Sequence, residues 1–316
     1  MDKRKLGNTD LLVSPITFGG NVFGWTLDEK NSFEILDGFI DAGFNLIDTA
    51  DVYSRWKPGN SGGESEKIIG NWIKARNNRN KIILTTKVGS DMGDGKKGLS
   101  KKYILEAIDA SLQRLQTDYL DLYQSHFDDL ETPVQETLEA YDQLIRAGKI
   151  RWIGASNFTP ERLKESLETS QRLSLPKYQT FQPEYNLYKR EGFEKEMEKV
   201  CLDNQLGVIS YYALASGFLT GKYRSEADLG KSPRGGGAKD FMNDRGFRIL
   251  KALDEVSELY NSTPASVALA WLIARPSVTA PIASVTSLNQ LQDLTKAAAL
   301  KLDNEALSIL DEASAW

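Results

Sequence analysis

Short apolar runs alternate with longer amphipathic stretches along the whole 316-residue chain. This alternation is typical of parallel strands joined by crossover helices. A hairpin expected to turn at Gly7 and Asn8 comes first. The eight expected strands are Pro15–Phe18, Asn45–Asp48, Lys81–Lys87, Tyr119–His126, Ile150–Ser156, Thr180–Gln182, Gly207–Tyr212 and Thr279–Ala283. Eight such units predict an α/β fold, a (β/α)₈ TIM barrel, although a doubly wound sheet uses the same alternation.

The amphipathic stretches predict the helices, and several carry end signals. Thr159 and Pro160 are typical of an N-cap followed by proline in the first turn, and Gly43 and Gly148 stand where helices should stop. The expected helices are Ser32–Ala42, Gly63–Arg76, Lys101–Leu115, Val134–Ala147, Pro160–Thr169, Phe193–Asn204, Phe247–Tyr260 and Ser287–Ala297. No Pro/Ser-rich linker divides the chain, so residues 1–316 are expected to form a single domain.

Composition narrows the class of partner. The formal net charge of −5 gives no reason to expect a nucleic acid or an anionic membrane. Cys201 is the only cysteine, which excludes an intramolecular disulfide framework and leaves too little sulfur for a structural zinc site, so no metal is expected. The N-terminus has basic residues without an apolar run after them, and no stretch approaches a membrane span. We expect a cytoplasmic protein, monomeric or weakly homo-oligomeric.

One connection is unusually long. The segment from Leu214 to Arg245 holds the triple glycine Gly235–Gly237 and shows no apolar periodicity. A loop of this length after a strand is either a disordered insertion or a binding lid. From the residues alone the two explanations are equally good.

Polar residues stand at or just after the ends of three consecutive expected strands. Asp48 ends one strand and Tyr53 follows five residues later, Lys87 ends the next, and His126, the only histidine, ends the third. Each has a bland explanation, such as a loop cap, a packing contact or a solvated charge. In a barrel, however, the carboxyl ends of all strands meet at one mouth, where active sites of this fold lie.

These side chains suggest one kind of chemistry. An ammonium such as Lys87 beside the Tyr53 phenol would stabilise phenolate and bring the phenol's pKa down, and Asp48 would keep the lysine charged. A neutral His126 imidazole could orient a carbonyl oxygen. Such a site donates a proton to a carbonyl oxygen while its carbon is attacked. Because no nucleophile or metal is in view and no Gly-x-Gly-x-x-Gly or Walker motif occurs, we expect the attacker to be a cofactor's hydride.

The residues closely resemble the aldo-keto reductase superfamily, in its bacterial and potassium-channel β-subunit-like branches. The resemblance extends over most of the chain through FNLIDTADVYS, ILTTKVG, RLQTDYLDLYQSH, AGKIRWIGASNF, QPEYNL and SYYALASGFLTGKYR. It implies that Tyr53 is the general acid, that Lys87 and Asp48 tune it, and that His126 orients a carbonyl substrate. It also implies an extended NADP(H) across the mouth, with NAD(H) as the alternative.

The resemblance also assigns cofactor contacts. Ser156, Asn157 and Gln182 match positions that hold the nicotinamide carboxamide, and Tyr211 matches the aromatic ring that stacks on the nicotinamide. The long connection now favours the lid, mobile in the free protein and ordered over the pyrophosphate. Its matching residues are Leu214, Ser216, Gly217, Leu219, Gly221 and Lys222, with Arg224 as a further cation.

Near the C-terminus the chain departs from its NADP(H)-dependent relatives. Where those have basic residues for the adenosine 2′-phosphate, this chain has Ser284, Thr286, Gln290 and Asp293, and no cation before Lys296. Lys222 or Arg224 would have to compensate, so the expected preference for NADP(H) over NAD(H) is narrow.

Substrate walls are expected from the loops after the first, second and fourth strands. They offer the aromatic residues Trp25, Trp56 and Phe127, with Arg55 and Lys57 as polar contacts that equally well only face solvent. Two other functions are compatible with the same residues: a regulatory barrel that senses the nucleotide and turns over slowly, and a Schiff-base aldolase using Lys87.

Overall fold

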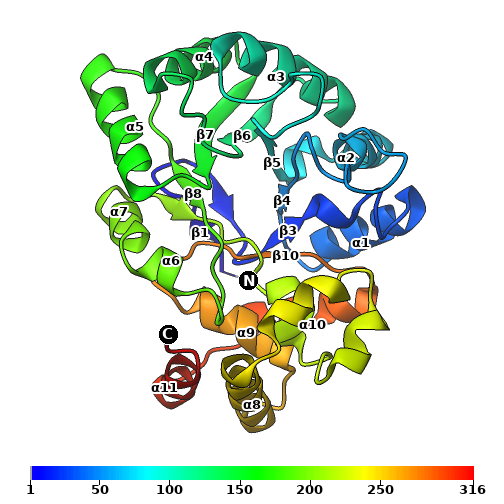
Figure 1. Ribbon diagram of the computed structural model, residues 1–316. Helices are drawn as coiled ribbons and strands as arrows, with labels where there is room; N and C mark the ends of the chain where they lie inside the picture. Colours follow the sequence, from blue (N-terminus) through cyan, green and yellow to red (C-terminus); the bar gives the residue numbers. More distant parts are fainter. Residues whose placement is uncertain (1) are drawn as a thin grey trace.

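A computed structural model describes residues 2–316 and shows an eight-stranded parallel sheet in the order β10-β3-β4-β5-β6-β7-β8-β9 (Figure 1). The outer strands meet through a parallel bridge between Val208 and Val278 and a 2.8 Å hydrogen bond from Ile282 N to Ser210 O. The predicted (β/α)₈ barrel is therefore confirmed. Its strands are β3 (Thr17–Gly19), β4 (Leu46–Asp48), β5 (Ile83–Val88), β6 (Leu120–Ser125), β7 (Ile150–Ser156), β8 (Thr180–Gln182), β9 (Gly207–Val208) and β10 (Ile282–Ala283).

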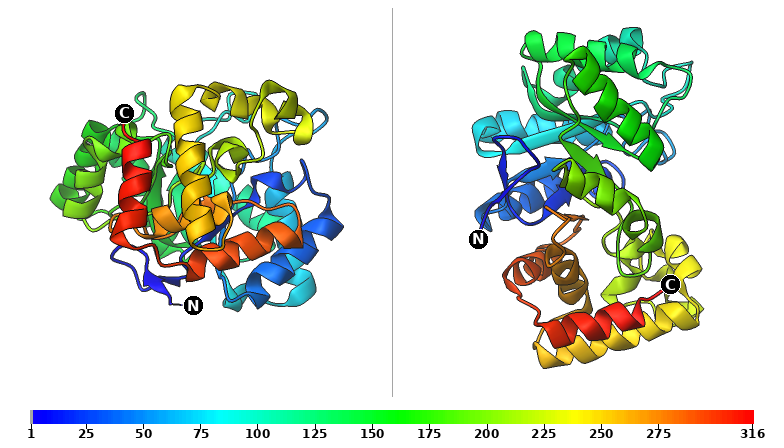
Figure 2. Two further views of the ribbon diagram at one scale, coloured as in Figure 1. Left: turned by 90° about the horizontal axis from the view of Figure 1, so that it is seen from below. Right: turned by 90° about the vertical axis from the view of Figure 1, so that its left-hand side faces the viewer.

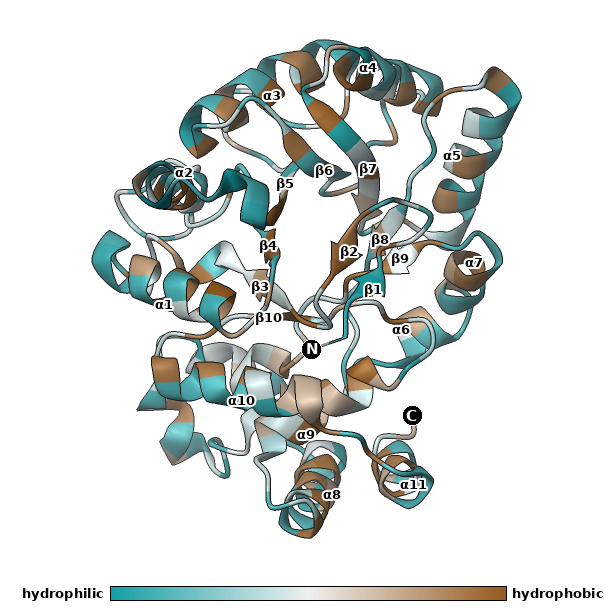
Figure 3. Cartoon of the chain, turned by 180° about the vertical axis from the view of Figure 1, so that it is seen from behind, coloured by the Kyte–Doolittle hydropathy of each residue, from teal (hydrophilic) through white to brown (hydrophobic). Residues whose placement is uncertain are grey.

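The helices surround the barrel, and most of them carry polar residues along one face and apolar residues along the other (Figure 3). Their ends follow the expected signals: Thr159 Oγ1 accepts from Arg162 N at 3.2 Å, and Gly43 and Gly148 have φ of 90° and 71°. The helices are α1 (Glu29–Asp41), α2 (Glu64–Arg76), α3 (Lys101–Leu115), α4 (Val134–Arg146), α5 (Pro160–Leu173), α6 (Glu191–Glu194), α7 (Met197–Asp203), α8 (Asp244–Leu259), α9 (Pro264–Ile273), α10 (Leu288–Ala299) and α11 (Asn304–Ala313).

One expected helix is corrected, and two helices are present beyond those named from the sequence. The helix expected over Phe193–Asn204 is two helices, α6 and α7, broken where Glu196 has φ of −137°. Helices α9 and α11 were not expected; every residue of α9 except Pro264 is buried, so it lacks an amphipathic period. In Figure 2, α8 and α11 lie side by side along the outer edge, and α8 packs on α9.

The last two strands are shorter than expected because the closing ladder is irregular. Thr279 N and Ala280 N both donate to Val208 O, over 2.9 and 3.2 Å. Pro281 has no N–H to continue the ladder. Regular pairing therefore resumes only at β10.

The N-terminal hairpin closes the bottom of the barrel. Strands β1 (Arg4–Lys5) and β2 (Leu12–Val13) pair antiparallel. Gly7 has φ of 58°, and a Cβ there would lie 2.2 Å from Gln179 O, so only glycine fits this turn against the barrel. The hairpin and the strand starts share one apolar cluster of Leu6, Leu11, Val13, Leu46, Ile83, Leu122, Ile209 and Ala280.

Polarity inside the barrel rises from this floor toward the mouth. Along β5, Ile83 belongs to the apolar floor, Thr85 lies above it and Lys87 lies at the top, each two residues apart. The same period carries β4 from Leu46 to Asp48. Alternate residues of a strand share a face, so the sequence that builds a dry floor also delivers charged side chains to the mouth.

The long connection after β9 is folded into three 3₁₀ helices: η3 (Ala215–Thr220), η4 (Glu226–Lys231) and η5 (Gly235–Phe241). Two of its three consecutive glycines lie where an added side chain would meet a neighbouring turn. A Cβ on Gly235 would lie 1.8 Å from Leu229 O, and one on Gly237 would lie 3.1 Å from Ser216 Oγ. The missing side chains let the three turns approach one another closely.

Among residues 2–316, no helix is both long and apolar enough to span a bilayer.

Candidate active site

The ends of β4 and β5 bring a carboxylate and an ammonium together. Lys87 Nζ donates to Asp48 Oδ2 over 2.6 Å and to Thr49 O over 2.8 Å, and both side chains are fully buried. A buried ion pair of this kind is stable only when its remaining polar atoms are also bonded. Here Thr49 O accepts one further hydrogen bond from the Lys87 ammonium.

Tyr53 reaches the pair from the loop after β4. Lys87 Nζ lies 2.8 Å from Tyr53 OH and donates to it. The loop is fixed at Ser54, whose φ is 72° and whose Oγ donates to Phe23 O over 2.5 Å. A strained residue held by a buried hydrogen bond fixes the phenol in one position.

The charges of the site differ in one respect from the expectation. Burial, followed by the negative charge of Asp48, raises the pKa of Tyr53 above its usual range. Burial lowers the pKa of Lys87, and Asp48 opposes that effect. The expected lowering of the tyrosine pKa by Lys87 is therefore outweighed in the protein without cofactor, and the phenol keeps its proton at neutral pH.

His126 faces Tyr53 from the end of β6, with ring centroids 6.0 Å apart. Ser90 Oγ lies 2.8 Å from His126 Nδ1, which leaves Nε2 for a ligand. Burial, and then the charge of Lys87, lowers the pKa of His126 well below its usual range, so the ring is neutral at pH 7. The structure thus brings together all four residues of the expected tetrad.

Gln124, Thr49 and Ser90 complete the site and were not anticipated. Gln124 Nε2 donates to Asp48 Oδ1 over 3.1 Å and lies 2.7 Å from Thr85 Oγ1. Its position two residues before His126 on one strand was the available signal, because residues two apart share a face. Thr49 contributes only its carbonyl, and no side-chain pattern reveals such a role.

The residues matched to the carboxamide contacts lie on neighbouring strand ends. Ser156 Oγ donates to Gln182 O over 2.8 Å, and Gln182 Nε2 donates to Asp48 Oδ1 over 3.1 Å. Asn157, at φ 57°, accepts from Tyr211 OH over 2.7 Å and donates to His126 O over 2.9 Å. The expected cofactor and tetrad residues therefore form one hydrogen-bonded network.

The start of the long connection concentrates backbone strain at the mouth. Tyr212, Ala215 and Ser216 have φ of 53°, 47° and 55°, and Gly217 follows at 89°. Left-handed conformations of residues other than glycine are costly and gather at ligand sites. The expected loop residues Leu214 and Leu219 lie here too, joined by a 3.3 Å hydrogen bond from Leu219 N to Leu214 O.

The cations of the lid are placed differently from the expectation. Arg224 forms two hydrogen bonds of 2.8 and 2.7 Å with Asp254, which hold it against α8, and its expected contact with the cofactor stays a prediction. Lys222 Nζ lies 5.0 Å from the Tyr223 ring centroid, beside Gly217. Gly221, at φ 76°, ends η3.

Arg234 is a cation of the long connection that could not be singled out from the sequence. Burial lowers the pKa of its guanidinium, whose charge acts on the hydroxyls of Tyr212 and Tyr53. Within residues 2–316, no ion pair and no side-chain hydrogen bond engages the guanidinium. A partly buried guanidinium without an acceptor is a natural partner for an anion.

The C-terminal candidates are mostly engaged with their own elements. Ser284 Oγ lies 2.7 Å from Gly19 O, and Asp293 Oδ1 accepts from Thr263 Oγ1 over 3.0 Å, so both serve helix and strand packing. Gln290 Oε1 accepts from Thr286 N over 2.8 Å. A cavity of about 340 Å³ opens beside them, lined by Asn31, Glu34, Ile35, Thr286, Ser287, Leu288 and Asn289. Glu34 is its only charged lining residue.

Aromatic rings surround Tyr53 as expected for a substrate wall. Trp56 lies 5.9 Å from Tyr53 and 5.7 Å from Trp25, measured between ring centroids. Phe127 stacks on His126 at 4.9 Å. Trp56 and Phe127 are each 48% exposed, so they can contact a ligand. Arg55 and Lys57 are exposed, with Arg55 reaching toward Gly93.

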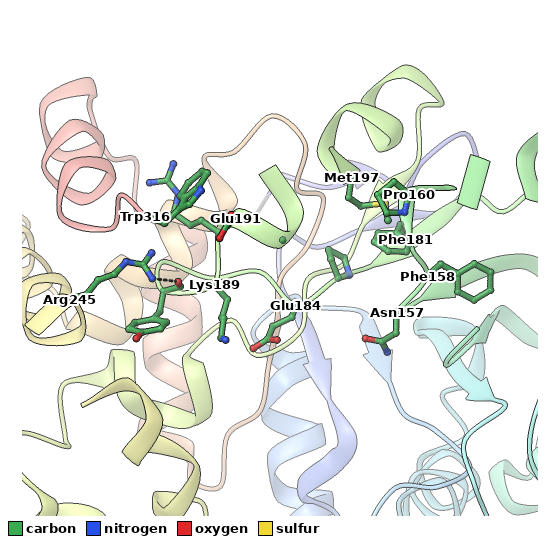
Figure 4. Close-up of a pocket in the computed structure, with 14 residues that line it drawn as sticks. Asn157, Phe158, Pro160, Phe181, Glu184, Lys189, Glu191, Met197, Arg245 and Trp316 are labelled. Carbon is green, nitrogen blue, oxygen red and sulfur yellow. Dashed lines mark hydrogen bonds between the residues drawn. The ribbon is translucent and has the colours of Figure 1, made fainter. Parts of the chain in front are cut away.

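A larger cavity of about 490 Å³ lies beside the mouth and has Asn157 in its wall (Figure 4). Phe158, Phe181 and Met197 form one side of it, and Trp316 and Arg245 the other. Arg245 is held by Tyr188 O at 2.9 Å. Asn157 also accepts a hydrogen bond from Tyr211. The cavity therefore adjoins the residues expected to contact the nicotinamide, and no tetrad residue lines it.

The fold is a (β/α)₈ barrel with a polar cluster at its mouth, and similarity to known proteins gives its family. The aldo/keto reductase family model matches residues 15–315. The Uncharacterized oxidoreductase YrpG of Bacillus subtilis is 37% identical over 320 residues, 99% of this chain and 95% of that protein. Aldo-keto reductase AMT2 of Alternaria alternata is 31% identical over 341 residues, 98% of this chain and 90% of that protein.

A third relative comes from the channel-associated branch. The Probable voltage-gated potassium channel subunit beta of Arabidopsis thaliana is 32% identical over 305 residues, 94% of this chain and 91% of that protein. This chain belongs to the aldo/keto reductase family, and the expected resemblance to its bacterial and channel-subunit-like branches is confirmed.

Proposed function

We propose that the protein reduces an aldehyde or ketone to an alcohol with NADPH or NADH, and that Tyr53 is the proton donor. The observation that carries this proposal is the buried arrangement in which Lys87 Nζ lies 2.8 Å from Tyr53 OH and 2.6 Å from Asp48 Oδ2. A bound nicotinamide would supply the hydride. The chain's own residues have to bind the carbonyl and supply a proton to its oxygen.

The proton comes from Tyr53. Burial raises the pKa of the phenol, so the proton is present at neutral pH, as a general acid requires. When the proton leaves, Lys87 stabilises the phenolate, because its ammonium already donates to that oxygen. Asp48 holds the ammonium in place, and Gln124 and Gln182 fix Asp48 through its other oxygen.

His126 orients the carbonyl. Its ring is neutral, and Ser90 Oγ at 2.8 Å occupies Nδ1, so Nε2 can donate to the substrate oxygen beside Tyr53. Two donors converging on one oxygen stabilise the negative charge that develops there during reduction. This role needs only a hydrogen bond, and the proton that is transferred stays assigned to Tyr53.

The residues present fit a dinucleotide. Tyr211, held by Asn157, offers a ring face for a nicotinamide, and the partnerless guanidinium of Arg234 together with Lys222 offers cations for a pyrophosphate. At the other end, the cavity beside Gln290 has Glu34 and no cation in its wall. A carboxylate accepts a ribose hydroxyl and repels a phosphate, so we infer a weak preference for NADPH or none.

The substrate side favours an apolar or aromatic carbonyl compound. Trp25, Trp56 and Phe127 give flat apolar surfaces around the Tyr53 hydroxyl. Arg55 and Lys57 are exposed at the rim and would bind polar substituents of larger, sugar-like substrates.

We also infer that the chain acts in the cytoplasm as a single domain, as a monomer or weak homo-oligomer.

A nucleotide-sensing barrel with slow turnover is the second candidate, favoured by the similarity to a probable potassium channel β subunit. Turnover separates the two functions. A reductase reduces several aldehydes at about 1 s⁻¹ or faster, whereas a sensor binds the nucleotide and turns over far more slowly.

A titration followed by a turnover assay tests the proposal. NADPH and NADH are titrated separately while their fluorescence is recorded, and oxidation of the bound nucleotide is then followed with a panel of aromatic and sugar aldehydes. We expect binding of both nucleotides at micromolar concentrations and oxidation that depends on the aldehyde. Failure to bind either nucleotide would overturn the proposal, and binding without oxidation by any aldehyde would favour the sensor.

A further inference from the structure

A second buried carboxyl lies close to the tetrad and has no part in the mechanism above. Asp51 stands three residues after Asp48 and two before Tyr53, and its backbone N–H donates to Lys87 O over 3.3 Å. Its side chain is 3% exposed, and its Oδ1 has no hydrogen-bond partner among the described residues. A buried carboxylate oxygen without a partner is costly, whereas a protonated carboxyl is less so.

Asp51 shares its surroundings with another carboxyl that has already taken the available partners. Glu66 of α2 is fully buried and accepts from Thr86 Oγ1 and from Arg114 Nε, each over 2.6 Å. Arg114 reaches it over Gly63, where a Cβ would lie 2.5 Å from the arginine side chain. The one guanidinium of the cluster therefore bonds Glu66 and leaves Asp51 without a bonded cation.

The titratable and charged groups that interact with the charge of Asp51 lie on two strands and three helices around it. They are Glu66 of α2, Tyr103 and Arg114 of α3, Lys87 of β5, Tyr123 of β6 and Tyr141 of α4. Burial, followed by the charge of Glu66, raises the pKa of Asp51 to about 8. Near pH 7 most molecules therefore hold a proton on this carboxyl.

We propose that Asp51, a buried carboxyl that Arg114 leaves without a bonded cation, is a positioning residue of the reductase site whose negative charge, once its proton is lost, opposes proton loss from Lys87 and Tyr53. This inference rests on the proposed function. In this proposal Asp51 acts on the site only through its charge. Its ionisation raises the pKa of Lys87, which is the direction that the proposal requires.

The consequence is a change in the alkaline limb of the pH profile. In the wild type, the charge of Asp51 appears above about pH 8 and raises the pKa of Lys87. By the same sign of interaction, the proposal requires that this charge keep Tyr53 protonated to higher pH. Asp51→Asn has nearly the same shape and no charge at any pH. We expect its alkaline limb for carbonyl reduction to begin at least about half a pH unit lower, because unit charges several ångströms apart in a protein shift each other's pKa by roughly that much or more.

Asp94→Asn is the matched control. Asp94 is exposed in the loop after β5, with φ of 53°, which asparagine also adopts readily. The same chemical change there should leave the wild-type profile in place. A change of folding alone in Asp51→Asn would lower the rate at every pH without moving the limb.

Protonation of Asp51 is read directly by infrared difference spectroscopy of the full chain. We expect the wild type near pH 7 to show a protonated-carboxyl band that Asp51→Asn lacks and that disappears above about pH 8. If Asp51→Asn does not fold, the pH titration of the wild type carrying ¹³C-labelled aspartate carboxyls gives the same readout. The absence of the band near pH 7, or equal alkaline limbs in the two proteins, would overturn the inference.

The two proposals fail in different ways. If no carbonyl compound is reduced, the proposed function fails, while the infrared band still reports on Asp51. In that case the Tyr53 phenolate absorbance, taken as wild type minus Tyr53→Phe, replaces the rate profile. It should appear at lower pH in the Asp51→Asn background, and an unchanged titration would overturn the inference.

Discussion

His126 is the only histidine of the chain, so its protonation can be followed without interference from another imidazole. The ring is packed between Tyr53 and Phe127 and shares a hydrogen bond with Ser90. Burial there lowers its pKa well below the usual value of 6.5. The unfolded chain therefore binds a proton at this residue in a pH range where the folded protein does not.

This difference predicts a specific loss of stability in acid. As pH falls below about 6.5, protonation favours the unfolded state, so the wild type should lose stability relative to His126→Gln by up to about 1.4 kcal/mol per pH unit. Denaturant unfolding of both proteins near pH 7.5 and pH 5.5 measures the two free energies of unfolding. Using the difference between the proteins removes the opposite contribution of Asp51, whose raised pKa is common to both. If the difference in free energy of unfolding between the two proteins does not change with pH, that result would contradict a buried, neutral His126.

The proposed weak preference between NADPH and NADH can be tested at Gln290. Its side chain folds back on Thr286, beside a cavity whose only charged lining residue is Glu34. Replacing it by arginine supplies a bidentate partner for a 2′-phosphate, so Gln290→Arg should bind NADPH about tenfold more tightly with little change for NADH. Fluorescence titrations give both affinities.

Gln292→Arg is the control for Gln290→Arg, because it adds the same charge two residues further along α10 at an exposed position. It should leave both affinities close to the wild type. A wild type that already prefers NADPH by several orders of magnitude would show that the phosphate is held elsewhere.

Among the elements, the segment from Leu214 to Arg245 contains both buried aromatic residues and exposed cations. Phe218, Tyr223 and Phe241 are buried, whereas Arg224 and Lys231 are exposed. A bound pyrophosphate would add partners for Lys222 and Arg234 and so favour the closed lid. Trypsin should therefore cut after Arg224 and Lys231 quickly in the free protein and slowly with saturating NADP(H).

The loop after β5 provides the internal control for this experiment. Lys96 and Lys97 are exposed there, away from the lid, and cleavage after them should not depend on the nucleotide. Lid cleavage at equal rates with and without nucleotide would mean that the segment is unrelated to cofactor binding.

The same segment shows what sequence reasoning could and could not find. The strand ends that carry Asp48, Lys87 and His126 were predictable, because a period of two and a loss of apolar character mark them locally. The contact between Gly235 and Leu229 was not, because glycine gives the same local signal whether it packs closely or stays free. Arg224 and Arg234 also look alike in sequence, and only the fold places Asp254 beside the first.

At the scale of the whole molecule, the barrel separates stability from chemistry. The hairpin and strand starts form a dry floor, with Leu122 fully buried among them, while the charged residues lie at the opposite end. The two regions could be assigned from the alternation along the strands. The contact between β9 and β10 that closes the barrel was harder to predict from the sequence, because Pro281 and the shared carbonyl of Val208 interrupt the regular hydrogen-bond pattern. That the chain forms one domain stays a prediction.

We propose that a carbonyl compound is reduced at the mouth of the barrel with a proton from Tyr53. Rapid-mixing single turnovers of wild type and Tyr53→Phe, with nucleotide bound and an aromatic aldehyde added, test it most directly. The substitution removes only the hydroxyl that accepts from Lys87 and keeps the ring between Trp56 and His126. We expect unchanged nucleotide affinity and a turnover rate lower by roughly 10²–10⁴-fold. A rate within a few-fold of the wild type would contradict it.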